Sequence, residues 1–212
     1  MESNEIELSS LIIKKISAAD GKAFIKEHHY SHGSHNWPMC YGLFLQTELV
    51  GVCAFATPCS ERVCSSVFGE EYKRTVTELH RLVLLDKMPR NTESWFIARA
   101  LRELKKDKPY YNAVLSFADR TESHVGYVYQ ATNAIYTGTS SKQTFYEDEL
   151  GRLRHPRQNG VNISLMDAKL RGWKRVRRDS KYRYLFLLPD NKRHKKELLK
   201  LLKLESLQYP KL

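Results

Sequence analysis

The 212-residue sequence contains no long hydrophobic run. None of its apolar segments approaches the ~18–20 residues that a membrane-spanning helix needs. Its first ten residues, MESNEIELSS, are polar and acidic, unlike a secretory signal peptide. The composition is nevertheless 42% hydrophobic, which is enough for a substantial core. We therefore expect a soluble intracellular protein of one ordinary domain, or of one domain with an appended tail.

Cysteine is scarce. The four cysteines, Cys40, Cys53, Cys59 and Cys64, form no CxxC pair and have no second pair at zinc-ribbon spacing. This pattern argues against a structural zinc site and against a disulfide framework. We expect free, buried thiols in a reducing compartment.

Acidic residues are depleted in the last third of the chain. Residues 150–212 contain 18 Lys and Arg but only 5 Asp and Glu, whereas residues 1–149 contain 17 and 19. The whole positive surplus of +11 therefore comes from the C-terminal segment. Charge that is segregated in this way usually serves a polyanionic partner, and nucleic acid is the first candidate.

Hydrophobic periodicity predicts alternating strands and helices. Helices are expected over 17–30 with Ser17 as N-cap, over 91–106, shortly after His124, and over 192–207. Residues 144–160 are expected to form a long, partly irregular connection. The expected strands cover residues 11–17, 41–45, 49–56, 75–85, 113–119, 135–137 and 182–188.

This order predicts an α/β fold, with a mixed sheet flanked by helices and a basic C-terminal extension. A strand–helix–strand unit that leads into a second helix is also how GNAT-type acyl-CoA N-acyltransferases are built. In that fold the cofactor pyrophosphate lies at the N-terminus of the first of these helices, where N–H groups lack helical partners. Residues 1–149 would form the catalytic core, and residues 150–212 a DNA-binding extension that completes the same domain.

The glycine-rich turn that usually binds this cofactor is missing. The sequence PRNTESW stands in its place. Arg90, Asn91, Thr92 and Ser94 could still offer N–H groups and hydroxyls to a phosphate or carboxylate. The alternative is that they only cap a helix.

A second candidate segment is SFADRTESHVGYVYQATNAIYTG. Asp119 lies just past the end of an apolar strand, which is a usual position for an active-site residue in α/β proteins. Tyr129 falls on the following helix, where a tyrosine of acyltransferases protonates the departing thiolate. His124 precedes that helix, and Asp119 and His124 could instead be helix caps.

The segment KEHHYSHGSHNW contains four histidines within ten positions. On a helix, His28 or His29 would lie one turn from His32, so that either pair could bind a transition metal. A carboxylate such as Asp119 could complete a site with two histidines and one carboxylate. The alternative is a solvated, histidine-rich loop.

Six segments stand in the order found in the Mom family of bacteriophage DNA-modification proteins. They are HHYSHG, TELHRLVL, PRNTESWFIARAL, SFADRTESHVGYVYQATNAIYTG, KYRYLFLL and the terminal YPK. The sequence resembles this family from about Phe24 to Pro210. The chain departs from the family pattern in its doubled histidine and in the insert TPCSERVCSSVFGEEYKR before Thr75.

The resemblance implies an acetyltransferase-like fold that lacks the usual glycine signature. It also implies an enzyme that converts adenine in duplex DNA to N6-(carbamoylmethyl)adenine in the cytoplasm of the infected bacterial host and so protects phage DNA from restriction. Acetyl-CoA or another small donor, and Fe(II), are the cofactors that it implies. The functional positions carried over by motif are His29, Tyr30, Ser94, Asp119 and Tyr129, with His28 as the alternative to His29.

The chemistry of adenine fits these residue types. Its exocyclic amine is a poor nucleophile that is paired inside the duplex, so an enzyme must extrude the base and supply a strong electrophile or a metal. His29 and Asp119 would act as bases or metal ligands. Tyr30 and Tyr129 would donate protons or stack on the base, and the helix start at Ser94 would hold an anionic donor.

The basic segment supplies cations for phosphates and aromatic rings for stacking. Two other functions stay open: an ordinary acetyltransferase acting on a small amine or a protein, and a DNA-binding protein without activity. The residues expected to contact DNA are Lys169, Arg171, Trp173, Lys174, Arg175, Arg177, Arg178, Lys181 and Arg183.

Overall fold

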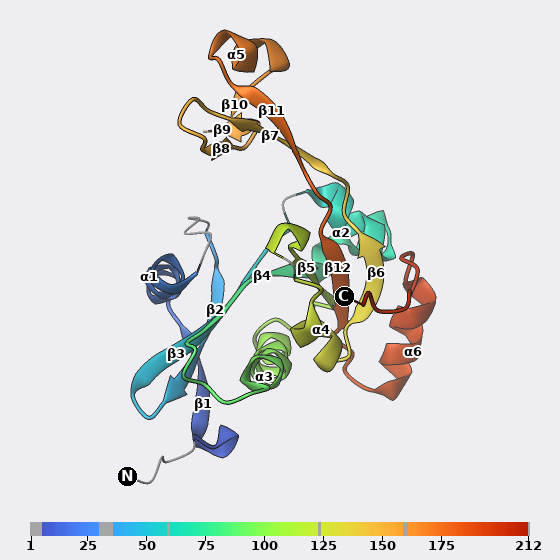
Figure 1. Cartoon of the computed structure of the whole chain (residues 1–212). Coiled ribbons are helices and arrows are strands. Elements are labelled where there is room, and N and C mark those ends of the chain that lie inside the picture. The colour runs from blue at the N-terminus through green and yellow to red at the C-terminus, as the bar shows by residue number, and fades with distance from the viewer. Residues whose placement is uncertain (1–5, 30–35, 59, 123, 159–160, 212) are drawn as a thin grey trace.

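A computed structural model describes residues 6–29, 36–58, 60–122, 124–158 and 161–211. A seven-stranded mixed sheet forms its centre (Figure 1). All neighbouring strands are antiparallel except β4 and β5. In spatial order the strands are β1 (Leu11–Ile16), β2 (Met39–Leu45), β3 (Glu48–Ala56), β4 (Val76–Leu84), β5 (Ala113–Ala118), β12 (Tyr182–Leu187) and β6 (Ile135–Thr139).

Helices cover both faces of this sheet. One apolar cluster joins the sheet to α3 and α4, whereas two further clusters join the opposite face to α1 and to α2 with α6. Successive side chains of a strand point to opposite faces of the sheet, so both faces can be covered by helices. Val114 of β5, for example, belongs to the first cluster, and Leu115 belongs to a cluster on the opposite face. The helices are α1 (Ala18–His28), α2 (Glu61–Phe68), α3 (Thr92–Asp107), α4 (Tyr127–Ala131) and α6 (Lys192–Leu201).

The parallel strands β4 and β5 pair only over their first halves. The register runs from Val76 opposite Ala113 to Leu79 opposite Ser116 and extends no further. At the same point β4 shifts its register against β3, because Ala54 pairs with Arg81 and Phe55 with Leu79. His80 is the extra residue of this bulge. Such bulges redirect side chains, and they are common beside active sites.

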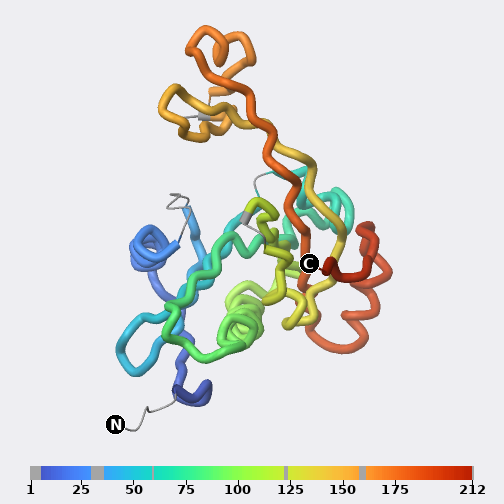
Figure 2. Tube along the Cα trace, viewed as in Figure 1, coloured from blue at the N-terminus to red at the C-terminus, as the bar shows by residue number. Residues whose placement is uncertain are grey.

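An arm projects from the end of the sheet (Figure 1). It is a prolongation of the antiparallel pair β6 and β12, so both of its ends are anchored in neighbouring strands. Its stem pairs β7 with β11 antiparallel, and Figure 2 shows these two segments running together away from the body. The arm consists of β7 (Gln143–Glu147), β8 (Leu153–Arg154), β9 (Arg157–Gln158), β10 (Val161–Asn162), α5 (Leu165–Leu170) and β11 (Lys174–Arg178).

The arm has a small core of its own. Tyr146, Ile163 and Ala168 are buried in it, and Trp173 packs against them. Asp148 stabilises the turn after β7, since its carboxylate accepts hydrogen bonds from Arg152 and Arg154. The arm therefore has a defined structure away from the main sheet.

The predicted mixed α/β sheet flanked by helices is confirmed, including the β4–α3–β5 unit that leads into α4. Ser17 caps α1 as predicted, with its hydroxyl 3.0 Å from the Asp20 backbone N–H. The three described cysteines are free and buried, as expected, and Cys59 lies outside the described residues. In the described part of the chain, no helix has the length and apolar composition to cross a bilayer.

Two parts of the prediction were incomplete. Helix α2 lies in the insert before Thr75, for which no element was expected. The segment 144–160, which was expected to be a partly irregular connection, also contains most of β7 and the small strands β8 and β9. Short strands of two residues have too little periodicity to be recognised in a sequence.

Candidate active site

A pocket of about 380 Å³ lies where β4 and β5 part. Its size is near the lower end of the range of about 300–1,000 Å³ that is usual for small-molecule sites. The end of β4, the end of β5, α4 with the loop before it, and the residue after α1 all contribute to its wall. The polar and aromatic residues that line it are His29, His80, Arg81, Phe117, Asp119, His124, Tyr127, Tyr129 and Lys181.

Asp119 is the carboxylate of this pocket. It follows β5 directly and is 8% exposed. Its Oδ1 accepts hydrogen bonds from the Thr121 backbone N–H at 3.1 Å and from the Thr121 hydroxyl at 2.7 Å. Its Oδ2 lies 3.2 Å from Lys181 Nζ and 3.5 Å from Arg178 Nη2.

These contacts decide the charge of Asp119. Burial by itself raises the pKa of this carboxyl. The hydrogen bonds from Thr121 and the charge of Lys181 outweigh burial, so the pKa lies below its ordinary value. Asp119 is therefore an anchored anion and a poor proton acceptor near neutral pH.

Glu78 and His80 form a second ionisable pair at the pocket. Oε1 of Glu78 lies 3.6 Å from Nε2 of His80, and both side chains are largely buried. Burial raises the pKa of Glu78 to about 7, although the charges of Lys181 and Arg81 act in the opposite direction. The Glu78 carboxyl can therefore take up or release a proton near neutral pH beside His80, which lines the pocket.

Tyr129 is held in the pocket wall by aromatic packing. Its ring centroid lies 5.4 Å from that of Tyr184 and 6.1 Å from that of Phe186. Helix α4 begins after Gly126, which has a φ of +80°. A Cβ on Gly126 would lie 2.5 Å from Tyr184 Cε2, so only glycine allows α4 to approach this ring.

Four residues predicted as catalytic from the sequence lie together around this pocket: His29, Asp119, His124 and Tyr129. They come from two separate parts of the chain, the end of α1 and residues 119–129. His29 caps the end of α1, with its backbone N–H 2.9 Å from the Ile25 carbonyl oxygen. Tyr30 lies outside the described residues.

The proposed metal ligands are only partly brought together. His29 and Asp119 line the same pocket, but His28 packs its ring 4.5 Å from that of Phe24. His32 lies outside the described residues. Within the described ranges, no group of three or more His, Cys, Asp or Glu side chains is placed to hold a metal ion. These residues therefore do not make a metal site on their own.

The residues expected to bind a cofactor lie at the start of α3, away from the lining of this pocket. The Thr92 hydroxyl donates to the Pro89 carbonyl at 2.6 Å, and the Ser94 hydroxyl donates to the Asn91 carbonyl at 3.0 Å. Asn91 has a φ of +68°, and its side chain makes no capping hydrogen bond. The two hydroxyls are therefore already bonded to local backbone, and Arg90 is exposed beside them.

The basic residues of the C-terminal third differ in their positions. Arg178 and Lys181 contact Asp119, which brings the stem of the arm to the pocket. Arg183 donates to the Thr137 hydroxyl at 2.9 Å and to its carbonyl at 2.8 Å, so its guanidinium is held within the main sheet. The remaining residues of the predicted DNA-binding set lie on the arm: Lys169, Arg171, Trp173, Lys174, Arg175 and Arg177.

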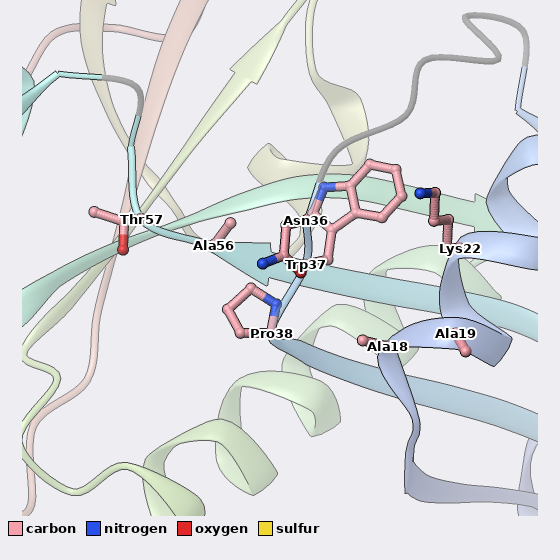
Figure 3. Close-up of a pocket in the computed structure, with 8 residues that line it drawn as sticks. All are labelled: Ala18, Ala19, Lys22, Asn36, Trp37, Pro38, Ala56 and Thr57. Carbon is pink, nitrogen blue, oxygen red and sulfur yellow. The ribbon is translucent and has the colours of Figure 1, made fainter.

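A larger hollow of about 720 Å³ lies between α1, the segment before β2 and the end of β3 (Figure 3). Lys22 is the only ionisable side chain among the described residues that line it. Trp37 and Pro38 form much of its surface in Figure 3. The described residues of this hollow include no carboxylate or imidazole, whereas the smaller pocket has both, so the smaller pocket is the candidate active site.

Sequence reasoning did not single out Glu78, His80 or Tyr127. Glu78 and His80 stand in TELHRLVL, which is one of the segments that carried the family resemblance. The sequence signal that could have pointed to them is a carboxylate and an imidazole two residues apart in a strand that is otherwise rich in apolar residues. The bulge that brings them to the pocket depends on strand pairing and has no local signature.

Comparisons with known proteins show the family of this chain. The Mom protein family matches residues 10–211. The chain is 32% identical over 211 residues to the methylcarbamoylase Mom of Escherichia phage Mu. This alignment covers 95% of this chain and 84% of that protein.

Solved acetyltransferases are similar in chain path. A putative acetyltransferase from Salmonella typhimurium, solved with acetyl-CoA, has a TM-score of 0.48 at 9% identity, over 86% of this chain and 96% of that chain. A spermidine N-acetyltransferase from Vibrio cholerae has a TM-score of 0.47 at 11% identity, over 84% of this chain and 94% of that chain. Because the family matches nearly the whole length of the chain and the phage Mu protein is 32% identical to it, the chain belongs to the Mom protein family.

Proposed function

We propose that this protein is a phage DNA-modification enzyme that transfers a small group to the N6 amine of adenine in double-stranded DNA. The product would be N6-(carbamoylmethyl)adenine or a close derivative, made in the cytoplasm of the infected host and protecting phage DNA from restriction. The relative from phage Mu is a methylcarbamoylase, which supports this reaction class. The observation that carries the proposal is the contact of Asp119 with Arg178 and Lys181, because it joins a pocket of acid–base groups to a basic arm.

The arm would bind the phosphates of the duplex. Between residues 143 and 178 there are 9 Lys and Arg but only 4 Asp and Glu. Binding through phosphates positions a protein on DNA without reading its sequence. The target adenine would then leave the base stack and enter the pocket, as in other enzymes that act on a base.

Within the pocket, different side chains would accept and donate the protons of the reaction. His80, oriented by Glu78, would accept the proton that the N6 amine loses on attack. Tyr129 would donate a hydrogen bond or proton to the departing part of the donor. Asp119, already anionic, would hold Lys181 and Arg178 in place and accept a hydrogen bond from the amine.

The donor would be a small molecule, and acetyl-CoA is the candidate that the resemblance implies. The start of α3 offers it no glycine-rich turn, and two hydroxyls there are bonded to local carbonyls. His29 and Asp119 are two of the three ligands that an iron site with His32 would need. Since the described residues do not complete either site, no step of the proposed reaction is assigned to coenzyme or metal.

The decisive experiment weighs nucleosides. DNA from cells that express the full chain is digested and analysed by mass spectrometry, with DNA from cells that express Asp119→Asn as control. We expect a heavier deoxyadenosine with the wild type and almost none with the variant. An unchanged deoxyadenosine mass under active wild-type expression would refute the proposed function. A modified protein or small amine would then indicate an ordinary acetyltransferase.

A further inference from the structure

Exposed apolar side chains gather on the arm. Thirteen large hydrophobic side chains are exposed in the described part of the chain, and the three with the greatest exposure all lie here. Leu170 is 79% exposed, and Leu150 and Met166 are each 73% exposed. Leu153, Val161 and Leu165 are also among the thirteen. Clustered exposure of this kind usually marks a surface that binds a partner.

Helix α5 presents three of these side chains in a fixed orientation. Its N-terminus is closed by a capping box, in which Ser164 and Asp167 bond to each other's backbone N–H groups. Ala168 on the inner side of α5 is fully buried in the core of the arm. The opposite side of the helix therefore turns Met166 and Leu170 to solvent, and Leu165 in the first turn is 45% exposed, so this exposure results from a defined fold.

Cations surround this apolar face. Lys169 lies between Met166 and Leu170 on α5, and Arg171 follows, with its guanidinium 5.2 Å from the Trp173 ring. Lys174 and Arg175 begin β11 directly afterwards. An apolar face with a basic border complements a partner that has a negative exterior and an apolar interior. Duplex DNA, with outer phosphates and stacked bases, has this character. A second copy of the arm would instead bring like charges together.

The direction of the stem also favours DNA. Arg178, at the end of β11 nearest the body, contacts Asp119 in the pocket. The five-residue strand β11, which ends at Arg178, leads from the α5 end of the arm to this contact and corresponds to about 16 Å of extended chain at ~3.3 Å per residue. That length matches about five base-pair steps of ~3.4 Å. A duplex that places one adenine in the pocket would therefore pass the tip of the arm a few base pairs away.

We propose that Met166 and Leu170 form a wedge that enters the base stack of the duplex about five base pairs from the target adenine. The inference rests on the proposed function, because it takes DNA as the substrate. Leu and Met are among the side chains that other DNA-bending proteins insert between base steps, where they unstack the step and kink the duplex. A kink here bends the flanking DNA toward the body and lowers the cost of extruding the adenine.

The test uses the full chain and duplexes that carry the fluorescent base 2-aminopurine at successive positions. The wild type is compared with the double variant Met166→Ser/Leu170→Ser. The matched control is Leu199→Ser/Leu201→Ser on α6, where the two side chains are 46% and 36% exposed. All the replaced side chains are exposed, so the variants are expected to fold, and circular dichroism checks this.

With the wild type and the control, we expect a rise in 2-aminopurine fluorescence at one step, about five base pairs from the modified adenine. In the wedge variant this rise should disappear at saturating protein. The affinity should fall about tenfold for each side chain, which is what full burial of a Leu or Met provides. Since no charge is removed, the salt dependence of binding should stay the same.

Three results would overturn the wedge. The first is a wedge variant that keeps both the fluorescence rise and the affinity. The second is a variant that changes only the oligomeric state in sizing experiments, which would make this face a contact with a second copy. The third is a variant that loses only binding to anionic vesicles of phosphatidylglycerol. In all three cases DNA from expressing cells would still contain modified adenine, whereas failure of the proposed function would leave deoxyadenosine unmodified with the wild type.

Discussion

Lys181 Nζ lies 3.2 Å from the Asp119 carboxylate, although 62 residues separate them in the chain. This contact joins the end of β5 to the segment between the arm and β12. Asp119 is tied to the arm a second time through Arg178. The position of the arm and the charge state of the pocket therefore depend on the same carboxylate.

Replacement of Asp119 by Asn should impair the reaction more than the fold. We expect adenine modification to fall at least about 100-fold, because misplacement of Lys181 and Arg178 distorts the pocket. The free energy of unfolding should drop by about 1–3 kcal/mol, since a buried carboxylate loses its charge and its contacts with two partly exposed cations are weakened. Nucleoside mass spectrometry and thermal unfolding measure the two effects.

Asp190→Asn is the matched control for that variant. Asp190 pairs with Lys105 at 3.1 Å but does not line the pocket. It should leave adenine modification unchanged. Equal losses of modification in both variants would mean that Asp119 acts only through stability.

Loss of the Tyr129 hydroxyl should reduce the rate while the aromatic packing remains. Tyr129→Phe keeps the ring contacts with Tyr184 and Phe186. We expect the rate of modification to fall by about 10²-fold or more, the usual contribution of a positioned proton donor. Tyr110→Phe, an exposed site outside the pocket, should have no effect on the rate. A Tyr129→Phe enzyme with the wild-type rate would exclude the hydroxyl from the chemistry.

Removal of two charges from the stem should flatten the salt dependence of DNA binding. Arg175 and Arg177 are exposed on β11, and neither contacts the pocket carboxylate. The double alanine variant should lower the slope of log K against log salt by about 0.9 for each lost phosphate contact. Arg193→Ala/Lys196→Ala on α6 removes the same charge from another surface and should leave the slope near the wild-type value. An unchanged slope in the β11 variant would show that these arginines do not contact phosphates.

The ionisation of Glu78 should make stability depend on pH. Its pKa in the folded chain is about 7, above the ordinary value of 4.5, so the unfolded chain releases this proton at lower pH. The stability that the neutral carboxyl provides is complete below about pH 4.5 and declines as the pH rises to about 7. Glu78→Gln stays neutral, and its melting temperature should therefore rise relative to the wild type over this interval.

The shift of about 2.5 pH units corresponds to roughly 3 kcal/mol at most. Thermal unfolding at pH 5 and pH 8 measures the difference. Glu103→Gln, on the exposed side of α3, is the control and should show no such trend. A difference between Glu78→Gln and the wild type that is the same at both pH values would contradict the assignment.

Much of the fold was predictable because most elements have strong local signals. Ser17 before α1 and the apolar periodicity of α3 are examples, and the long strand β3 is an almost uninterrupted apolar run. The arm was not predictable, because strands of two residues carry no measurable period. The bulge at His80 was also hidden, since it arises from the pairing of β4 with β3.

Some members of the candidate site were predictable from the sequence, but their arrangement was not. Sequence patterns pointed to Asp119, His124 and Tyr129, which lie close together in the chain, and to His29, which does not. Their common pocket depends on long-range packing, which no local pattern records. The pKa of Asp119 is lowered first by the hydrogen bonds from Thr121 in its own segment and then by the charge of Lys181, and only the second contribution depends on long-range packing.

The prolongation of β6 and β12 into a hairpin arm has an evolutionary consequence. A hairpin that leaves and re-enters a sheet on neighbouring strands can lengthen, shorten or be exchanged while the register of the sheet is kept. The arm can therefore change during evolution while the sheet that carries the candidate active site is inherited unaltered.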